Sequence, residues 1–443
     1  MTSSHLPPAA CQWFSRLAAA LDRRSAPRLV LLFLGAVLAR GRRTVTSGIR
    51  AAGLSGEFRP CYTTVAAVGK KADDIAARLA FAAVKPMVAE SRRLTLALDD
   101  TPTQRYGPHV QGAGVHHNPT PGPAGSPYVY GHVWVVLGLL ATHKTWGVIA
   151  LPLLARLYVR KKDLPGIAPK HRPPFRTKLE LAVELLRWAS TWLGLLGKPL
   201  WVVADGAYAK AAFLKPAMGL GVTVVSRLRK DAALWTVPVP RPSGRRGRPR
   251  IYGEHRIALA KRAGQHRGWT TGVFDLYGQP TVKRYKTFLA TWRPAGGVIR
   301  VVLVDEPTGW VAFFCTEASA TVVDILTTVA DRFSLETTFR DCKEVVGAGQ
   351  QQVRFVWANV GAFHLCLWTF TMTESWAWGR QADVLVDRSA SPWDDPGRRP
   401  SHADKRCAWR RALLREEIQA VLRPGVTEEE IQAAAERLLS LAA

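Results

Sequence analysis

Acidic residues are scarce in this sequence. Its 443 residues include 34 Asp and Glu against 61 Lys and Arg, which gives a net charge of +27 at pH 7. A folded surface with such an excess repels itself, and a polyanionic partner is the usual reason for it, nucleic acid first and an anionic membrane second. The imbalance disfavours a charge-balanced metabolic enzyme and favours a protein that binds a polyanion.

Long apolar segments and paired cysteines are also missing. The longest apolar runs, 29–39 and 133–141, are well short of the roughly 20 residues that a transmembrane helix needs. The first ten residues contain no basic segment followed by an apolar stretch, so no secretory signal is predicted. The six cysteines form no C-x-x-C pair, which argues against a disulfide framework or a zinc knuckle. We therefore expect a soluble cytoplasmic protein, associated with the nucleoid and without a membrane partner.

Both ends of the chain are predicted to be helical. Residues 1–90 contain apolar clusters with few turn formers, and within them 40–71 is rich in basic residues and has one acidic residue, Glu57. This pattern suits a small DNA-binding module of the helix-turn-helix kind, and it suits a helical bundle with a basic surface equally well. Residues 381–443 end in an amphipathic helix and are predicted to form a C-terminal helical appendage.

The middle of the chain alternates strand and helix patterns. Strands are predicted at 94–98, 128–140, 146–159, 200–204 and 222–226, with a helix at 176–195 and a short helical stretch before the last strand. This order predicts an α/β fold with an RNase H-like mixed sheet and flanking helices. We expect the first part of this core at 91–230, a basic β-rich insertion at 231–318, and the second part of the core at 319–380.

Two of the predicted strands end in aspartates. The first runs into Asp99-Asp100-Thr101, and the fourth runs into Asp205-Gly206. In an RNase H-like core the carboxylates at these two strand ends meet. Because neighbouring residues of a strand point to opposite faces, only one of Asp99 and Asp100 can face the shared site. An Asp before Gly is also a common turn former, which is the structural alternative for Asp205.

A later helical pattern supplies a third acid. At about 100° per residue, Arg332, Glu336, Arg340 and Lys343 form one stripe on a helix predicted over 321–344, and the apolar stripe lies beside it. A purely solvated charged face would lie opposite the apolar stripe. The arrangement therefore favours a helix that packs on the sheet with Glu336 at a site, although ordinary Arg–Glu pairing at four-residue spacing gives the same pattern.

The spacing of Arg332, Glu336 and Lys343 resembles a known signature. Bacterial insertion-sequence transposases of the DDE class include a group with a Y-R-E-K motif, in which Tyr, Arg, Glu and Lys are separated by three, four and seven residues. The Tyr position is Val329 here. The Asp-Thr and Asp-Gly of this sequence resemble the first two acid motifs of the group, which also carries a β-rich insertion before the Glu. The resemblance covers residues 90–380.

The resemblance implies the chemistry of a metal-dependent DNA endonuclease and strand transferase. Asp100, which precedes a Thr as in the family, would be catalytic with Asp205 and Glu336, and the three would hold two Mg²⁺ or Mn²⁺ ions. Arg332 and Lys343 would bind phosphates of the cleaved strand. Arg340, on the same stripe, is a further candidate DNA contact.

The implied partners follow from the same resemblance. They are double-stranded DNA, as the terminal inverted repeats of an insertion sequence and as target DNA, and further copies of the chain in a homodimer or larger assembly on paired ends. Two alternatives remain: a DNA-binding protein that kept the fold and lost catalysis, and a non-transposing RNase H-like nuclease such as a resolvase.

The predicted insertion carries much of the positive charge. Residues 226–300 contain 17 Lys or Arg and three Asp or Glu, and the segment 244–250 has the sequence Gly-Arg-Arg-Gly-Arg-Pro-Arg. This segment resembles an AT-hook core, in which Arg246 and Arg248 would enter a narrow A·T-rich minor groove. A basic loop that binds phosphates without sequence preference explains the composition equally well. Both hypotheses predict that Arg246 and Arg248 contact DNA.

Overall fold

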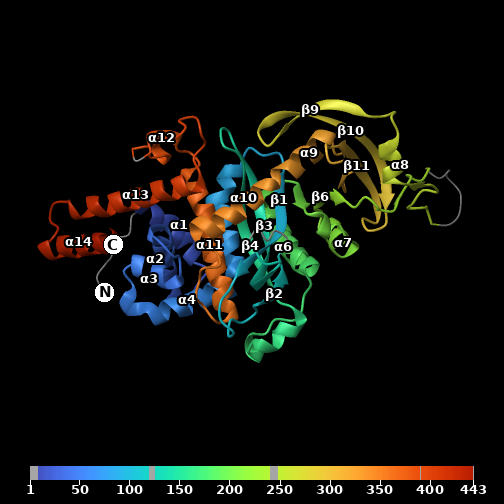
Figure 1. Ribbon diagram of the computed structural model, residues 1–443. Helices are drawn as coiled ribbons and strands as arrows, with labels where there is room; N and C mark the ends of the chain where they lie inside the picture. Colours follow the sequence, from blue (N-terminus) through green and yellow to red (C-terminus); the bar gives the residue numbers. More distant parts are fainter. Residues whose placement is uncertain (1–7, 119–124, 240–247, 390, 443) are drawn as a thin grey trace.

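The computed structural model describes residues 8–118, 125–239, 248–389 and 391–442, and the chain begins with a group of helices. They are α1 (Pro8–Ala18), α2 (Ser25–Leu38), α3 (Val45–Ala51), α4 (Phe58–Lys70) and α5 (Ala72–Leu79), followed by helical turns at 80–84 and 85–88. α2 has no charged residue after its first turn, and most of it is buried. The helical character predicted for this part of the chain is confirmed (Figure 1).

Helix α4 is held against a later helix, α11 (Val356–Ala377), through glycines. A Cβ atom placed on Gly361 would lie 1.9 Å from the backbone oxygen of Val65, and one on Gly69 would lie 2.0 Å from that of Trp357. Only residues without a side chain permit this backbone approach. The N-terminal helices are therefore packed directly on the central part of the molecule.

The first part of the sheet has the topology of an RNase H-like core. Its strands are β1 (Leu94–Gln104), β2 (Gly114–His117), β3 (Tyr128–His143), β4 (Gly147–Tyr158), β5 (Leu200–Ala204) and β6 (Thr223–Leu228). β3 pairs antiparallel with β4 and β1, while β1, β5 and β6 are parallel neighbours. Every residue of β5 is buried, as expected for a parallel strand covered on both faces. The predicted fold class is confirmed.

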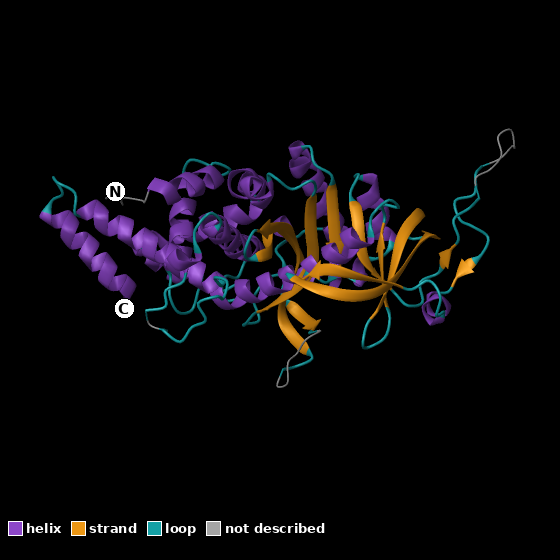
Figure 2. Cartoon of the chain, turned by 90° about the horizontal axis from the view of Figure 1, so that it is seen from above, coloured by secondary structure: helices purple, strands orange, loops and turns teal. Residues whose placement is uncertain are grey.

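The sheet continues beyond β6 into the segment predicted as an insertion. The elements there are β7 (Leu234–Trp235), β8 (Arg256–Ile257), α8 (Leu259–Gly264), β9 (Thr270–Leu276), β10 (Gln279–Trp292), β11 (Gly297–Asp305) and β12 (Val311–Cys315). β12 pairs antiparallel with β6, and β11 and β10 follow in order. The added strands thus extend the core sheet instead of forming a separate one, and they cover an edge that would otherwise be open (Figure 2).

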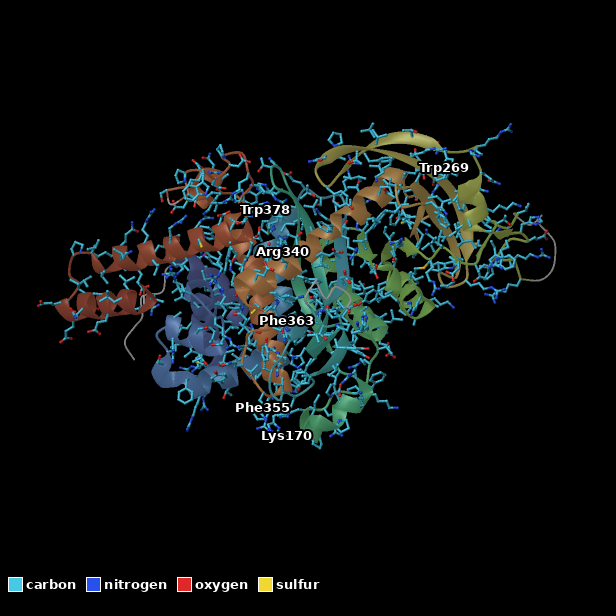
Figure 3. The ribbon with its side chains drawn as sticks, in the orientation of Figure 1. Lys170, Trp269, Arg340, Phe355, Phe363 and Trp378 are labelled. Atoms are coloured by element: carbon cyan, nitrogen blue, oxygen red, sulfur yellow. The ribbon has the colours of Figure 1, made fainter. Side chains whose placement is uncertain are left out.

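Helices cover both faces of the core sheet. α6 (Lys178–Trp192) and α7 (Ala211–Gly219) pack together beside one face, and α6 begins at a capping box formed by Thr177 and Glu180. On the other face lie α10 (Phe333–Asp341) and α11. There Trp134 of β3 stacks on Phe363 of α11 with ring centroids 4.0 Å apart, and Phe363 is labelled in the middle of Figure 3.

The helix predicted over 321–344 is divided in two. α9 (Val322–Asp331) ends where Arg332 interrupts the regular pattern, α10 follows, and a π-helical turn covers 342–346. The hydroxyl of Ser334 donates to the backbone oxygen of Asp331 at 2.7 Å, a local bond that competes with regular helix bonding. The break lies at Arg332, whose side chain contacts Asp99 and Glu336.

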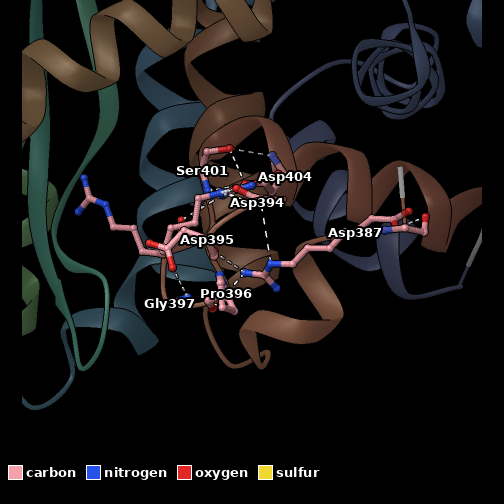
Figure 4. Close-up of polar contacts among 11 residues, drawn as sticks. Asp387, Asp394, Asp395, Pro396, Gly397, Ser401 and Asp404 are labelled. Carbon is pink, nitrogen blue, oxygen red and sulfur yellow. Dashed lines mark hydrogen bonds and ion pairs between the residues drawn. The ribbon is translucent and has the colours of Figure 1, made fainter. Parts of the chain in front are cut away.

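The C-terminal helices are α12 (Ala382–Leu385), α13 (His402–Val421) and α14 (Glu428–Ala442). The first half of α13 is part of the core, because buried Glu374 of α11 accepts hydrogen bonds from Lys405 at 2.6 Å and from His402 at 2.7 Å. Before this helix, Arg398 bridges Asp394 and Asp404 (Figure 4). Within the described residues, no helix is both long and apolar enough to cross a membrane.

Candidate active site

Asp99 and Asp205 come together because two parallel strands are in register. Leu98 of β1 pairs with Ala204 of β5, so the next residue of each strand is an aspartate at the same level. Neighbouring residues in register point to the same face of a sheet. Their charges interact, and Asp205 is one of the groups that raise the pKa of Asp99. Sequence reasoning predicted this meeting of strand ends, and the structure places it at Asp99.

Arg332 connects Asp99 to the predicted third acid. Its Nη1 lies 2.6 Å from Oδ2 of Asp99, and its Nη2 lies 2.9 Å from Oε1 of Glu336. The side chains of Asp99 and Arg332 are about one-fifth exposed, at 19% and 21%, whereas that of Glu336 is 45% exposed. One guanidinium thus holds a carboxylate of the first strand and a carboxylate of α10 on the same face of the sheet.

Asp100 lies on the opposite face of β1. Its Oδ2 accepts a hydrogen bond from Nζ of Lys178, at the start of α6, at 2.5 Å, and its Oδ1 accepts one from the hydroxyl of Tyr208 at 3.2 Å. The sequence motif favoured Asp100 as the first acid, but the structure does not place it beside Glu336. The strand motif gives the order of the two aspartates, and the pairing of β1 with β5 and β3 decides which face each one takes.

The electrostatics of the site reflect its crowded carboxylates. Burial raises the pKa of Asp99 to about 6; the guanidinium of Arg332 and the backbone N–H of Asp100 oppose this increase, and the charges of Asp100 and Asp205 add smaller increases. Burial and the same carboxylates also raise the pKa of the Tyr208 phenol, so this hydroxyl stays protonated and donates its hydrogen bond. Closely spaced carboxylates are costly without a cation between them, and in this structure the cation is Arg332.

The donor chemistry of the site fits a hard divalent metal. Asp99, Asp205 and Glu336 offer only carboxylate oxygens, which Mg²⁺ and Mn²⁺ prefer. As the side chains stand, however, no three His, Cys, Asp or Glu residues among those described are close enough together to hold a metal ion. In this structure Glu336, whose side chain is 45% exposed, is held by Arg332.

A sequence model of the family described as DDE superfamily endonuclease matches residues 16–292, which is more than half of the chain. The chain belongs to this family. The match covers both strand-end aspartate motifs of this DDE superfamily endonuclease and ends before Glu336. Members of the superfamily generally use divalent metal ions, and the family implies DNA as the substrate. No curated protein matches the chain.

The remaining predicted DNA contacts of this endonuclease differ in their placement. The side chain of Arg340 is 61% exposed and lies 3.4 Å from Asp341 (Figure 3). Lys343 is half-buried, and burial lowers its pKa; among the described residues it forms no ion pair with the three carboxylates. Arg248 is exposed. Arg246 lies outside the described residues.

Sequence reasoning missed two residues that touch the site. Lys178 is separated from Asp100 by 78 positions, and only the fold brings the start of α6 to β1. Tyr208 lies three residues after Asp205, in a short helical turn in which the backbone N–H of Ala207 donates to the Asp205 carboxylate. Its position close to a strand-end aspartate was a signal in the sequence, but nothing there showed that its hydroxyl would donate to Asp100.

Proposed function

We propose that this DDE endonuclease is a transposase. It would cleave DNA at the terminal inverted repeats of an insertion sequence and join the freed ends to target DNA, using two Mg²⁺ or Mn²⁺ ions. The observation that carries this proposal is the convergence of Asp99, Asp205 and the Arg332–Glu336 pair on one face of an RNase H-like sheet. The transposase signature in the sequence and the strong positive charge of the chain add to it.

The three carboxylates are assigned as metal ligands. Divalent ions held by Asp99, Asp205 and Glu336 would supply activation of the attacking oxygen and stabilisation of the leaving oxygen. Because Asp205 is exposed and Glu336 is nearly half exposed, DNA can reach these oxygens from solvent. Asp99 is the most buried of the three, and its ion pair with Arg332 holds its side chain in place.

Arg332 is assigned to phosphate binding. Its guanidinium already forms charge-assisted bonds with two carboxylates from different elements, and the same planar fork suits the oxygens of a phosphate. Among the described residues, Arg340, which is 61% exposed beside Asp341, and Arg248 add exposed positive charge that would contact the duplex farther along. Arg246 and Lys343 remain proposed DNA contacts.

Asp100 is assigned a positioning role. Its bonds to Lys178 and Tyr208 attach the start of α6 and the turn after β5 to β1. The bond from Tyr208 thereby holds the turn that follows Asp205 against β1. Asp100 would therefore support the site without binding the metal.

The wider organisation of the transposase is proposed from the same reasoning. The N-terminal helical domain at 1–90 would bind the ends of the element, and a homodimer or larger assembly would hold two ends together. The insertion at 231–318 would bind the DNA next to the cleavage site. The core segments at 91–230 and 319–380 would perform the cleavage. The C-terminal helices at 381–443 have no role in this assignment.

Cleavage of DNA that carries the element ends tests the function. The DNA on either side of the gene is searched for imperfect inverted repeats, which would mark the ends of the element. A plasmid with both repeats is then incubated with the protein in Mg²⁺ or EDTA. Metal-dependent cuts at the repeat boundaries support a transposase. Binding without cleavage would identify an inactive DNA-binding derivative, and cleavage of branched junctions in place of the repeats would identify a resolvase-like nuclease.

A further inference from the structure

A cavity lies at the far end of β1 from the carboxylates. It has a volume of about 340 Å³ and is formed where three segments meet: the connection between α2 and α3, the segment after β1, and the segment before α11. Its lining residues are Arg42, 105–110 and 349–354. Six residues of extended strand separate Asp99 from Arg105, a distance of about 20 Å, so this cavity is distinct from the carboxylate site.

Backbone and side-chain hydrogen bonds hold the walls of the cavity in place. Gln350 accepts a hydrogen bond from the backbone N–H of Arg43 at 2.8 Å. Nη1 of Arg105 donates to the backbone oxygens of Gly349 and Gln351 at 3.0 and 2.6 Å. The three segments are therefore fixed to one another before any ligand arrives.

The charged side chains in the lining of the cavity are all arginines. Its lining includes Arg42, Arg105, Arg354 and His109, and none of the described lining residues is an Asp or Glu. Arg42 and Arg354 are exposed and form no ion pair with any described residue. The lining thus presents three guanidinium groups without a carboxylate to balance them.

Arg105 is the most unusual of these groups. It is only 4% exposed, and its Nη2 has no hydrogen-bond partner among the described residues. Burial lowers its pKa to about 10, so the side chain remains charged at neutral pH. A buried charge without a counter-ion is costly, and each unsatisfied donor adds to the cost. An anion in the cavity would offset the charge of Arg105 through space.

More positive charge lies behind the cavity wall. Arg43 is half-buried with an unpartnered Nε, and Arg406 of α13 is buried near it. The two arginines and Arg105 all act on the buried thiol of Cys366, whose pKa is raised to about 12 by burial and partly lowered by their charges. The positive potential at the cavity is therefore the sum of several guanidinium groups.

We propose that this cavity binds a phosphate group of the DNA substrate, away from the bond that is cleaved. Guanidinium groups bind phosphate oxygens through paired hydrogen bonds, and the exposed guanidinium groups of Arg42 and Arg354 lie in the lining of this cavity. The ring of Tyr106 is part of the lining and is 69% exposed, and the ring of Phe355, next to Arg354, is 59% exposed and labelled in the lower part of the molecule in Figure 3. The proposal rests on DNA being the substrate, as proposed above.

The test measures DNA binding without cleavage. The full-length protein is titrated into a fluorescent duplex in EDTA at salt concentrations between 50 and 200 mM, and the slope of log affinity against log salt is determined. The double variant Arg42→Gln/Arg354→Gln changes the cavity. The control Arg415→Gln/Arg423→Gln removes the same charge from exposed positions on and after α13. Equal melting temperatures show that both variants fold.

The cavity variant is expected to lower the magnitude of the slope by about 0.9, because the cavity binds one phosphate and each lost phosphate contact removes about 0.9, while the control keeps the wild-type slope. Equal slopes for the wild type and the cavity variant would overturn the proposal. If the wild type binds no DNA, the proposed function fails instead, so the two failures are distinguishable.

A second arm identifies the source of the phosphate. Inorganic phosphate and a mononucleotide are added to the wild type and the cavity variant, and the melting temperature is recorded. A small increase for the wild type alone, together with the changed DNA slope, agrees with a phosphate site used by DNA. An increase with an unchanged DNA slope would show that the cavity takes a free phosphate compound, and it would overturn the assignment to DNA.

Discussion

Nη1 of Arg332 lies 2.6 Å from Oδ2 of Asp99, and this ion pair connects the helix of the third acid to the first strand of the sheet. The same guanidinium also holds Glu336. A positive charge therefore stands between two of the carboxylates that are assigned to the metal. In the proposed site, a divalent ion would stabilise the same negative charges as Arg332 and would compete with it for Glu336.

Replacing Arg332 tests this competition. Arg332→Gln should increase the rise in melting temperature that Mg²⁺ or Ca²⁺ produces, because the carboxylates lose the cation that now offsets their repulsion. Cleavage should fall by about 100-fold, the size of effect seen when one group that stabilises transition-state charge is removed. Thermal melting with and without metal is the measurement. Arg340→Gln, at an exposed position on the same helix, is the control, and an equal metal response in both variants would contradict the account.

The buried pair between Glu374 and Lys405 predicts a pH-dependent stability. Burial alone would raise the pKa of Glu374, but Lys405 and His402 lower it to about 2. A carboxyl group with a depressed pKa stabilises the fold above its unfolded-state pKa, near 4.5, and this contribution is lost as the pH falls toward 2. Urea unfolding should therefore show stability decreasing below about pH 4.5.

The variant Glu374→Gln should cost about 3–5 kcal/mol at pH 7, since it leaves the Lys405 charge buried without its partner. It should also flatten the pH dependence between pH 5 and 3. The control Glu429→Gln changes an exposed residue of α14 and should have little effect. Equal unfolding free energies for the two variants would show that the buried pair does not anchor α13.

The contact between α4 and α11 predicts a steric effect. Gly361→Ala would place a methyl group 1.9 Å from the backbone oxygen of Val65, so the helices must separate. We expect a loss of about 1–3 kcal/mol, typical of overpacking. Gly379→Ala is the matched control, because a Cβ there meets no atom within 4 Å. Denaturant unfolding that gave the same stability for both variants would argue against this helix contact.

Local sequence patterns were enough to predict which helices and strands form. They did not predict which face of each element is turned toward its neighbours. The strand at 200–204 was predictable from a continuous apolar run, and the helix at 176–195 from its apolar spacing; the structure shows β5 and α6 at these places. The order of these elements was enough to predict an RNase H-like core. Such signals involve residues that are close in the chain.

The parts that could not be predicted depend on distant contacts. The face taken by Asp99 is set by the pairing of Leu98 with Ala204, which lies more than 100 residues away. The attachment of α13 depends on Lys405 finding Glu374 across a turn-rich segment. A helical wheel for 321–344 correctly placed Arg332 near Glu336, yet it assumed a continuous helix and missed the break beside Arg332.

DNA cleavage by variants of the two aspartates of β1 tests most directly the claim that Asp99, and not Asp100, is the first acid of the site. Asp99→Asn and Asp100→Asn are compared with the wild type on DNA carrying the inverted repeats in Mg²⁺, with binding measured in EDTA. The account predicts that Asp99→Asn abolishes cleavage, as Asp205→Asn and Glu336→Gln do, while DNA binding stays nearly intact. Asp100→Asn should retain cleavage within about 10-fold of the wild type, since a positioning residue acts only through its neighbours. An inactive Asp100→Asn together with an active Asp99→Asn would contradict the assignment of the site.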